Sequence, residues 1–243
     1  MKKFVFCLIA VVAIATLLLL PGQTFAGSKW IPWDLGTNNS LDTGNWEVES
    51  QTNAEGDECY DYAVVDGRLK VWHTVESGCA GQRIFFKVTD STYTEMKVHL
   101  TVDESFNCHR ARIVADFIET ADGKEIFHQF CLVGNINQSC PYSVMSRVMS
   151  YVPWDVMFDG FFKGPWGYSL PIVGETYLLR TTVQKNSFDC ELENTMGESY
   201  GKIKLEVPGG RLSLPDKPYL GLSCFSPYEN SSGVVWFENP MVR

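Results

Sequence analysis

Alternation of apolar and polar residues is the dominant pattern along this chain. In each alternating segment, apolar side chains occupy every second position and polar side chains occupy the positions between them. A period of two residues is typical of β-strands that bury one face. The pattern therefore predicts strands at residues 68–72, 83–88, 95–102, 110–119, 125–133, 177–183, 202–207, 219–225 and 233–238.

Turn-forming residues separate these segments. Asp66-Gly67 and Asp122-Gly123 are typical of tight hairpins, and further Gly-rich turns follow at residues 208–210 and 230–233. No long helical period and no internal repeat is found in the sequence. Many short strands at this spacing predict an all-β fold, a two-sheet antiparallel β-sandwich of the jelly-roll kind.

The first residues have the layout of a secretory signal peptide. Lys2 and Lys3 precede an apolar run at residues 4–20, and small residues flank a cleavage position before Gly27. The alternative is a retained membrane anchor, but the run is shorter than the roughly 20 residues that a spanning helix needs. We predict a bacterial-type signal peptide at residues 1–26, a secreted or periplasmic protein, and no membrane span after cleavage.

The remaining residues, 27–243, contain no Ser/Gly tract, proline run or charge block that would mark a linker, so one domain is predicted. Without Lys2 and Lys3, 18 basic and 29 acidic side chains remain, a formal net charge of about −11. An acidic surface argues against nucleic acid and anionic membranes as partners.

Cleavage of the leader removes Cys7 and leaves seven of the eight cysteines. In an oxidising compartment most of these should form disulfides. Zinc is disfavoured because no C-x-x-C motif occurs and the four histidines are scattered. Since seven is odd, one thiol is left over, either free or bridging two chains in a homodimer.

Hairpin geometry predicts a pairing, although seven cysteines permit others. Cys59 and Cys79 flank the first Asp-Gly turn, and folding at residues 122–123 sets Cys131 opposite Val114. Cys190 and Cys224 lie in two late β segments. The expected disulfides, which leave Cys131 unpaired, are Cys59–Cys79, Cys108–Cys140 and Cys190–Cys224.

Five short motifs occur in order along the chain: LDTGNW at 41–46, DGRLK at 66–70, GETYLLR at 174–180, YLGL at 219–222 and VWFENPMV at 235–242. Together they resemble the concanavalin A-like lectin/glucanase jelly rolls, which include laminin-G-like domains and family 16 glycosidases. The resemblance covers most of the chain after the leader. It implies a jelly roll with a concave sheet and a carbohydrate-directed function.

The resemblance also implies a structural calcium ion between the N-terminal loop and the closing strand. Asp34, Asn38 and Glu238 are the candidate oxygen ligands. The closing strand has Glu238-Asn239 where the family usually has Asp-Asn. This departure weakens the assignment of the metal site.

The glycosidases of this fold carry Glu-x-Asp-x-Glu or Glu-x-Asp-x-x-Glu on one strand. Here Asp116 and Glu119 match the last two carboxylates, but Val114 stands at the nucleophile's position. Because a valine cannot attack an anomeric carbon, a non-catalytic protein is favoured, with Asp116 and Glu119 as the catalytic alternative. Exposed surface acids near a turn are the default interpretation of both residues.

Residues 151–168 contain seven aromatic side chains within eighteen residues, together with Gly and Pro and without alternation. We expect a long loop, or a loop with a helical turn, in an insertion at about 141–172. Aromatic rings stack on the apolar face of a pyranose, and nearby polar groups bind its hydroxyls. The alternative is a lid over one end of the sandwich. The candidate ligand-binding residues are Trp154, Asp155, Asp159, Phe161, Lys163, Trp166 and Tyr168.

Three functions follow from these patterns. The first is an exported, non-catalytic, lectin-like module that binds carbohydrate through residues 151–168 and the concave sheet. The second is a glycoside hydrolase or lyase acting on polysaccharide. The third is a structural or partner-binding envelope protein, dimeric through the odd cysteine.

Overall fold

Strands account for all regular secondary structure in the described part of this computed structural model. The structure describes residues 29–37, 39–74, 78–103, 110–117, 126–133, 144–150, 155–161, 173–184, 187–206, 218–226 and 233–243. The chain divides into two units, residues 1–30 and 31–243, and the second holds every strand described. Within these ranges no helix is long and apolar enough to cross a membrane.

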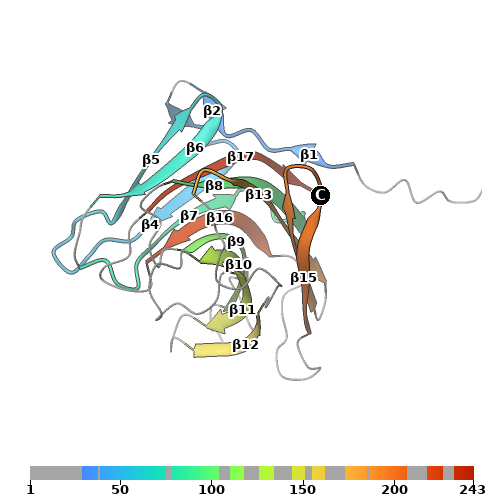
Figure 1. Cartoon of the computed structure of the whole chain (residues 1–243). Coiled ribbons are helices and arrows are strands. Elements are labelled where there is room, and N and C mark those ends of the chain that lie inside the picture. Colours follow the sequence, from blue (N-terminus) through green and yellow to red (C-terminus); the bar gives the residue numbers. More distant parts are fainter. Residues whose placement is uncertain are drawn as a thin grey trace, which may run out of the picture. The chain divides into compact units, whose positions relative to one another are not determined.

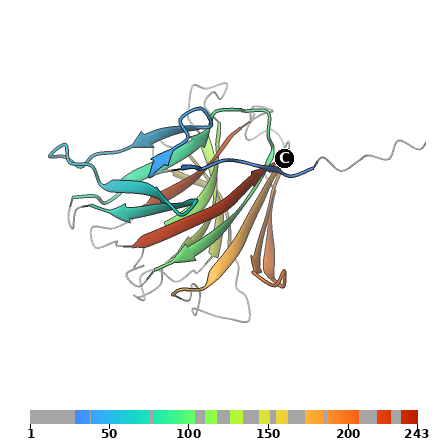
Figure 2. The ribbon, with the colours of Figure 1, turned by 90° about the horizontal axis from the view of Figure 1, so that it is seen from above.

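The first of two large sheets has the strand order β15-β14-β13-β8-β17-β6-β5, with β1 added along β17. Neighbouring strands are antiparallel, and Figure 2 looks onto this eight-stranded sheet, whose strands fan out with the usual twist. Its members are β1 (Ile31–Pro32), β5 (Tyr60–Val65), β6 (Arg68–His73), β8 (Glu95–Val102), β13 (Thr176–Gln184), β14 (Ser187–Asn194), β15 (Ser199–Glu206) and β17 (Val234–Val242).

The second sheet has seven antiparallel strands in the order β12-β11-β10-β9-β16-β7-β4, and β2 (Gly36–Thr37) and β3 (Ser40–Leu41) form a separate hairpin. Figure 1 shows the seven-stranded sheet curling strongly, with the eight-stranded sheet arching over its convex side. Its members are β4 (Trp46–Ser50), β7 (Arg83–Val88), β9 (Arg110–Phe117), β10 (Ile126–Val133), β11 (Val144–Ser150), β12 (Asp155–Phe161) and β16 (Tyr219–Phe225).

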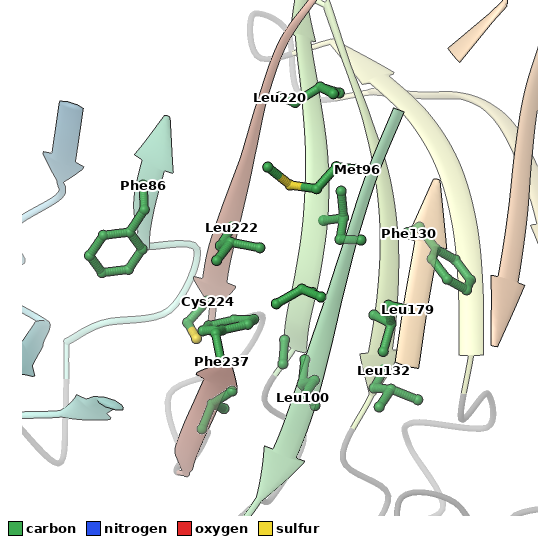
Figure 3. Packing of buried hydrophobic residues seen from close by; sticks show 14 of the residues in the cluster. Phe86, Met96, Leu100, Phe130, Leu132, Leu179, Leu220, Leu222, Cys224 and Phe237 are labelled. Carbon is green, nitrogen blue, oxygen red and sulfur yellow. The ribbon is translucent and has the colours of Figure 1, made fainter. Parts of the chain in front are cut away.

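The hydrophobic core lies between the two sheets. Alternate residues of each strand point into it, as in β8, where every second residue from Met96 to Val102 is buried. Figure 3 shows Leu100 and Phe237 of the eight-stranded sheet packed near Leu222 of the other. Full burial of such a side chain contributes about 1.5–3 kcal/mol, so this layer dominates the stability of the sandwich.

The all-β sandwich predicted from the sequence is therefore confirmed, and three predicted strands, β7, β8 and β16, have the expected bounds. The Asp66-Gly67 hairpin is also confirmed. Both residues have positive φ, 52° and 73°, which is the backbone geometry of a two-residue type I′ turn.

Within the insertion expected at about 141–172, the loop expected at residues 151–168 is wrong over residues 155–161. Residues 144–150 form β11 and residues 155–161 form β12, the edge strand of the seven-stranded sheet. The ladder between them shifts register between Val148 and Met149, which is a β-bulge or irregularity. Strand identity here comes from pairing with a neighbour, which a search for alternation misses.

The disulfide Cys59–Cys79 is confirmed and joins the two arms beyond the first hairpin. The predicted Cys190–Cys224 disulfide is wrong. Cys190 lies in β14 of the eight-stranded sheet and Cys224 in β16 of the other, and both are buried free thiols.

The hairpin formed by β9 and β10 is present, but its predicted register is wrong by two residues. Cys131 lies opposite Arg112 rather than Val114. Cys108, Cys140 and the turn at residues 122–123 lie outside the described residues. Cys131 is also buried.

Candidate functional site

The concave face of the seven-stranded sheet carries buried polar side chains rather than apolar ones alone. On β9, Ala111, Ile113 and Ala115 point into the core, so the side chains of Arg112 and Asp116 lie on the opposite, concave face. A second apolar cluster shares that face and contains Phe85, Val114, Phe127 and Met149. The described residues of β9 from Ala111 to Asp116, and all of β10, are therefore buried on both faces.

Arg112 is the centre of this polar array and is fully buried. Its Nε donates a 3.0 Å hydrogen bond to Ser223 Oγ, and its Nη1 donates a 2.5 Å hydrogen bond to Gln129 Oε1. The guanidinium lies 4.8 Å from the ring centroid of Phe225 and 5.7 Å from that of Phe127. Two hydrogen bonds to side chains on the neighbouring strands β16 and β10, together with two ring contacts, thus hold the guanidinium in one orientation.

Asp116 lies two residues after Val114 on β9, so both side chains are on the same face of the sheet. Asp116 is only 2% exposed. Its cross-strand neighbours are Phe127 on β10 and Tyr219 on β16. A buried carboxylate therefore lies between two aromatic residues in the ladder. This finding overturns the default interpretation of Asp116 as an exposed turn-proximal acid.

The catalytic alternative is not assembled from these neighbours. Retaining glycosidases need two carboxyls about 5–5.5 Å apart, and inverting enzymes about 6.5–9.5 Å. Both described residues paired with Asp116 across the ladder are aromatic, and Val114 precedes it on its own face. Glu119 lies outside the described residues.

The rim of the concave face at β4 and β7 is charged. Lys87 Nζ lies 3.0 Å from Glu47 Oε2 and 2.9 Å from Glu49 Oε1, and 5.4 Å from the ring centroid of Tyr219. Burial by itself lowers the pKa of Lys87, but hydrogen bonds and charge from Glu49 and Glu47 outweigh it, so the pKa is raised. The ammonium therefore stays protonated beside Tyr219.

Gly221 in β16 makes room at the centre of this sheet. A Cβ at this position would lie 2.3 Å from Phe85 Cε2 and 2.3 Å from the carbonyl oxygen of Phe86. The absent side chain lets the Phe85 ring lie across β16 on the concave face. The glycine thus shapes the sheet surface two residues from Tyr219.

The predicted ligand-binding segment meets this sheet at its edge. The register pairs Asp159 with Arg147, and Phe161 with Met145, both of β11. Asp155 pairs with Ser150 at the other end of β12. The side chains of these three predicted residues lie outside the described part, as do four whole residues, namely Trp154, Lys163, Trp166 and Tyr168.

Two of the three candidate calcium ligands, Asp34 and Glu238, lie within the described residues. Asp34 Oδ1 accepts a 2.9 Å hydrogen bond from the backbone N–H of Gly36, and Glu238 lies in β17 opposite His99. Asn38 lies outside the described residues. Among the residues that the structure describes, no group of three His, Cys, Asp or Glu side chains is placed to hold a metal ion.

A cysteine and a histidine meet in the core, but they are not arranged for nucleophilic catalysis. Cys190 Sγ lies 3.8 Å from His128 Nε2, which also makes a 2.8 Å hydrogen bond with Ser146 Oγ. Burial raises the pKa of Cys190 to about 12 and lowers the pKa of His128 to about 3. Both groups are therefore neutral at pH 7, and the contact is a structural one.

A groove of about 500 Å³ lies on the eight-stranded sheet, away from the concave face. Glu95 accepts hydrogen bonds there from Arg180 at 3.3 Å and from Arg243 at 2.5 Å, and Glu191 pairs with Lys202 at 2.8 Å. None of the described residues that line this groove is aromatic, and Glu95 and Glu191 are engaged by cations of the groove itself. The concave face is the better candidate because it combines polar groups with rings.

Sequence reasoning missed Arg112, Gln129 and Ser223. One signal was present, since residues 126–133 are apolar at most positions on both faces, which is typical of a strand covered on both sides. A polar residue in such a strand must find partners, because burying it alone is costly. Which partners it finds depends on the pairing of β9, β10 and β16.

Comparison with known proteins identifies the fold. No family model and no curated protein sequence matches this chain. The seed lectin of Lotus tetragonolobus superposes with a TM-score of 0.55 at 9% identity, covering 88% of this chain and 97% of the lectin. The lectin UEA-II, complexed with galactose, gives 0.54 at 10% identity, over 88% and 98% of the two chains.

A Bacillus subtilis protein of unknown function with a galectin-like fold gives a TM-score of 0.54 at 8% identity, covering 88% of this chain and 98% of that one. At such low identity these likenesses show the fold alone. The fold is the concanavalin A-like jelly roll, as the sequence motifs implied.

Proposed function

Because the chain has a concanavalin A-like jelly-roll fold, we propose that it is an exported lectin-like protein that binds carbohydrate on the concave face of its seven-stranded sheet. The observation that carries the proposal is the half-buried ring of Tyr219, which has the Lys87 ammonium over it and Asp116 as its cross-strand neighbour. Export rests on the leader at residues 1–26, which remains a prediction from the sequence.

The chemistry of a sugar suits this arrangement. A pyranose has an apolar C–H face that packs on aromatic rings, while its hydroxyls donate to a carboxylate. Tyr219 is half-buried and Lys87 lies over its ring, so the ring and the ammonium both face the rim of the sheet. The Arg112 network holds three neighbouring strands of the same face together, since Arg112 of β9 donates to Ser223 of β16 and to Gln129 of β10.

The likeness to sugar-binding proteins supports the same proposal. The similar lectin UEA-II is described in complex with galactose, and it shares the fold over nearly the whole chain. Since fold alone does not determine function, the proposal depends on the side chains named above. A neutral hexose or a short oligosaccharide of such units is the proposed ligand class.

A glycan array probed with the purified exported protein tests the proposal, followed by calorimetric titration of the strongest ligand with and without added calcium. Asp116→Asn removes the charge of the acceptor and should weaken binding at least tenfold, about 1.4 kcal/mol. Tyr219→Leu removes a ring and should weaken binding to a similar extent.

Glu206→Gln is the matched control, because it removes one negative charge from an exposed position on β15. Its affinity should equal that of the wild type. An array without any retained glycan, or equal affinities for Asp116→Asn and the control, would refute the proposal. Release of reducing ends from a polysaccharide panel would instead favour the glycosidase alternative.

A further inference from the structure

The outer face of the eight-stranded sheet brings two tryptophans and two cations together. Arg68, Lys70 and Trp72 are alternate residues of β6, and Trp236 of β17 lies opposite Lys70 in the ladder. Their neighbours Leu69, Val71 and Val235 point into the core, so these four side chains share the outward face. All four are half-buried, and we call them the aromatic–cation patch.

The rings hold the cations in place. Lys70 Nζ lies 5.3 Å from the ring centroid of Trp72 and 5.3 Å from that of Trp236, so the ammonium sits between two indoles. Arg68 Cζ lies 4.4 Å from the ring centroid of Trp236. A cation within about 6 Å of a ring centroid is attracted to it. The contacts therefore restrict two long side chains that otherwise swing in solvent.

Arg68 and Lys70 contact aromatic rings, whereas Lys202 and Lys204 on the same sheet contact carboxylates. Lys202 and Lys204 each pair with a carboxylate, Glu191 at 2.8 Å and Glu206 at 2.9 Å. Within the described part of the chain, neither cation of the patch forms such an ion pair, although Glu238 lies nearby on β17. Their charge is thus available to an anion from solution.

Small and polar residues border the patch. Ala63 on β5 lies opposite Lys70, and Thr101 on β8 lies opposite Trp236. Asp61, which is exposed, lies opposite Trp72. The single methyl group of Ala63 leaves the approach to Lys70 open, while Thr101 and Asp61 provide acceptors for hydroxyl groups.

We propose that the aromatic–cation patch is a second binding surface, specific for an acidic saccharide whose pyranose bears a carboxylate or a sulfate. The anion pairs with Lys70 and Arg68, and the sugar ring packs against the exposed parts of Trp72 and Trp236. The formal net charge of −9 disfavours long polyanions and favours a short acidic unit. This surface lies on the other sheet from the proposed neutral-sugar site and is independent of it.

Calorimetric titration of the purified exported protein with trigalacturonate tests the proposal. The methyl ester of trigalacturonate is the uncharged control ligand, and a sulfated trisaccharide is the second anionic ligand. The acid should bind at least tenfold more tightly than the ester. The double variant Arg68→Gln/Lys70→Gln should lose at least tenfold in affinity, and Lys70→Met alone should lose a smaller part while its stem keeps packing.

The matched control is Lys202→Gln/Lys204→Gln, which removes two cations that are already paired on the same sheet; its affinity should change less than twofold. Asp116→Asn should leave acid binding unchanged, so the two proposed surfaces can fail separately. Absence of binding by both acidic ligands, equal losses in the two double variants, or equal affinity for acid and ester would overturn the proposal. Binding to phosphatidylserine vesicles, but not to saccharides, that depends on Lys70 would reassign the patch to membranes.

Discussion

Replacing Gly221 with alanine tests how tightly the concave sheet is packed. Gly221 lies in β16, between β7 and β9, in the middle of the seven-stranded sheet. The added Cβ would lie 2.3 Å from Phe85 Cε2, 3.0 Å from Phe85 Cζ and 2.3 Å from the carbonyl oxygen of Phe86. Since comfortable carbon contacts begin at about 3.5 Å, both the ring and the β7 backbone must move.

The expected loss of stability follows from these contacts. Overpacking a core costs about 1–3 kcal/mol. Because one clash is with a backbone carbonyl that a rotamer change cannot relieve, we expect the upper end, about 3 kcal/mol. For a chain of this length each kcal/mol lowers the melting temperature by about 2–4 °C. Gly221→Ala should therefore melt about 6–12 °C below the wild type.

Thermal unfolding followed by circular dichroism measures this difference, with Gly44→Ala as the control glycine. A Cβ at Gly44 would meet only Asp42 Oδ1, at 3.2 Å, so a shift of a few tenths of an ångström in that side chain relieves the contact. The control should change stability by less than about 0.5 kcal/mol. A melting temperature of Gly221→Ala equal to that of the control would show that the sheet accommodates the methyl group, and the reasoning would be wrong.

Three further outcomes are expected. Replacing both Cys59 and Cys79 with serine opens a loop with a sequence separation of 20, so unfolding free energy measured by denaturant titration should fall by about 3 kcal/mol; no loss would contradict this. Burial raises the pKa of the thiols of Cys190 and Cys224, to about 12 for Cys190, so iodoacetamide at pH 8 should label both only after unfolding, as peptide mass spectrometry would reveal. Burial lowers the pKa of His128 from 6.5 to about 3, so the unfolded chain binds a proton that the folded chain does not. Stability should then fall as pH drops from about 6.5 towards 3, by at most about 1.4 kcal/mol per pH unit, and His128→Gln should flatten this slope in denaturant titrations.

Substitutions on the concave face of the seven-stranded sheet should affect stability as well as binding, because the candidate site lies on central, buried strands. Asp116 and Arg112 lie on a strand with neighbours on both sides, and the strand is buried on both faces. A change in packing at Gly221 therefore reaches Tyr219 and the Phe85 ring on the same face. Binding and folding experiments on matched variants separate the two effects.

Local patterns in the sequence determined the strands and the tight turns. In β8 the alternation from Glu95 to Val102 is uninterrupted, and each apolar residue in it is buried. The Asp66-Gly67 pair specifies its hairpin because these two residues tolerate positive φ. That hairpin in turn brings Cys59 and Cys79 within reach of each other. Such features depend on residues close together in the chain.

Register and sheet membership were decided only by the tertiary structure. A shift of two residues leaves every side chain on the same face, so alternation cannot distinguish Arg112 from Val114 as the partner of Cys131. Alternation likewise indicates that Cys190 and Cys224 lie in strands, but not that these strands belong to different sheets. The β12 edge strand depends on pairing with β11.

The candidate site belongs to this second category. The sequence around Asp116 is typical of an exposed acid. It is buried in the structure because β9 lies between β10 and β16, and because apolar side chains of the neighbouring strands lie on the same face of the sheet. Its neighbour Phe127 faces it across the β9–β10 hairpin, while Tyr219 is about a hundred residues away in the sequence and is brought beside it by the pairing of β9 with β16. Burial of alternate residues is a local property that the sequence determines. The contacts between strands are long-range, and only the assembled sheets decide them.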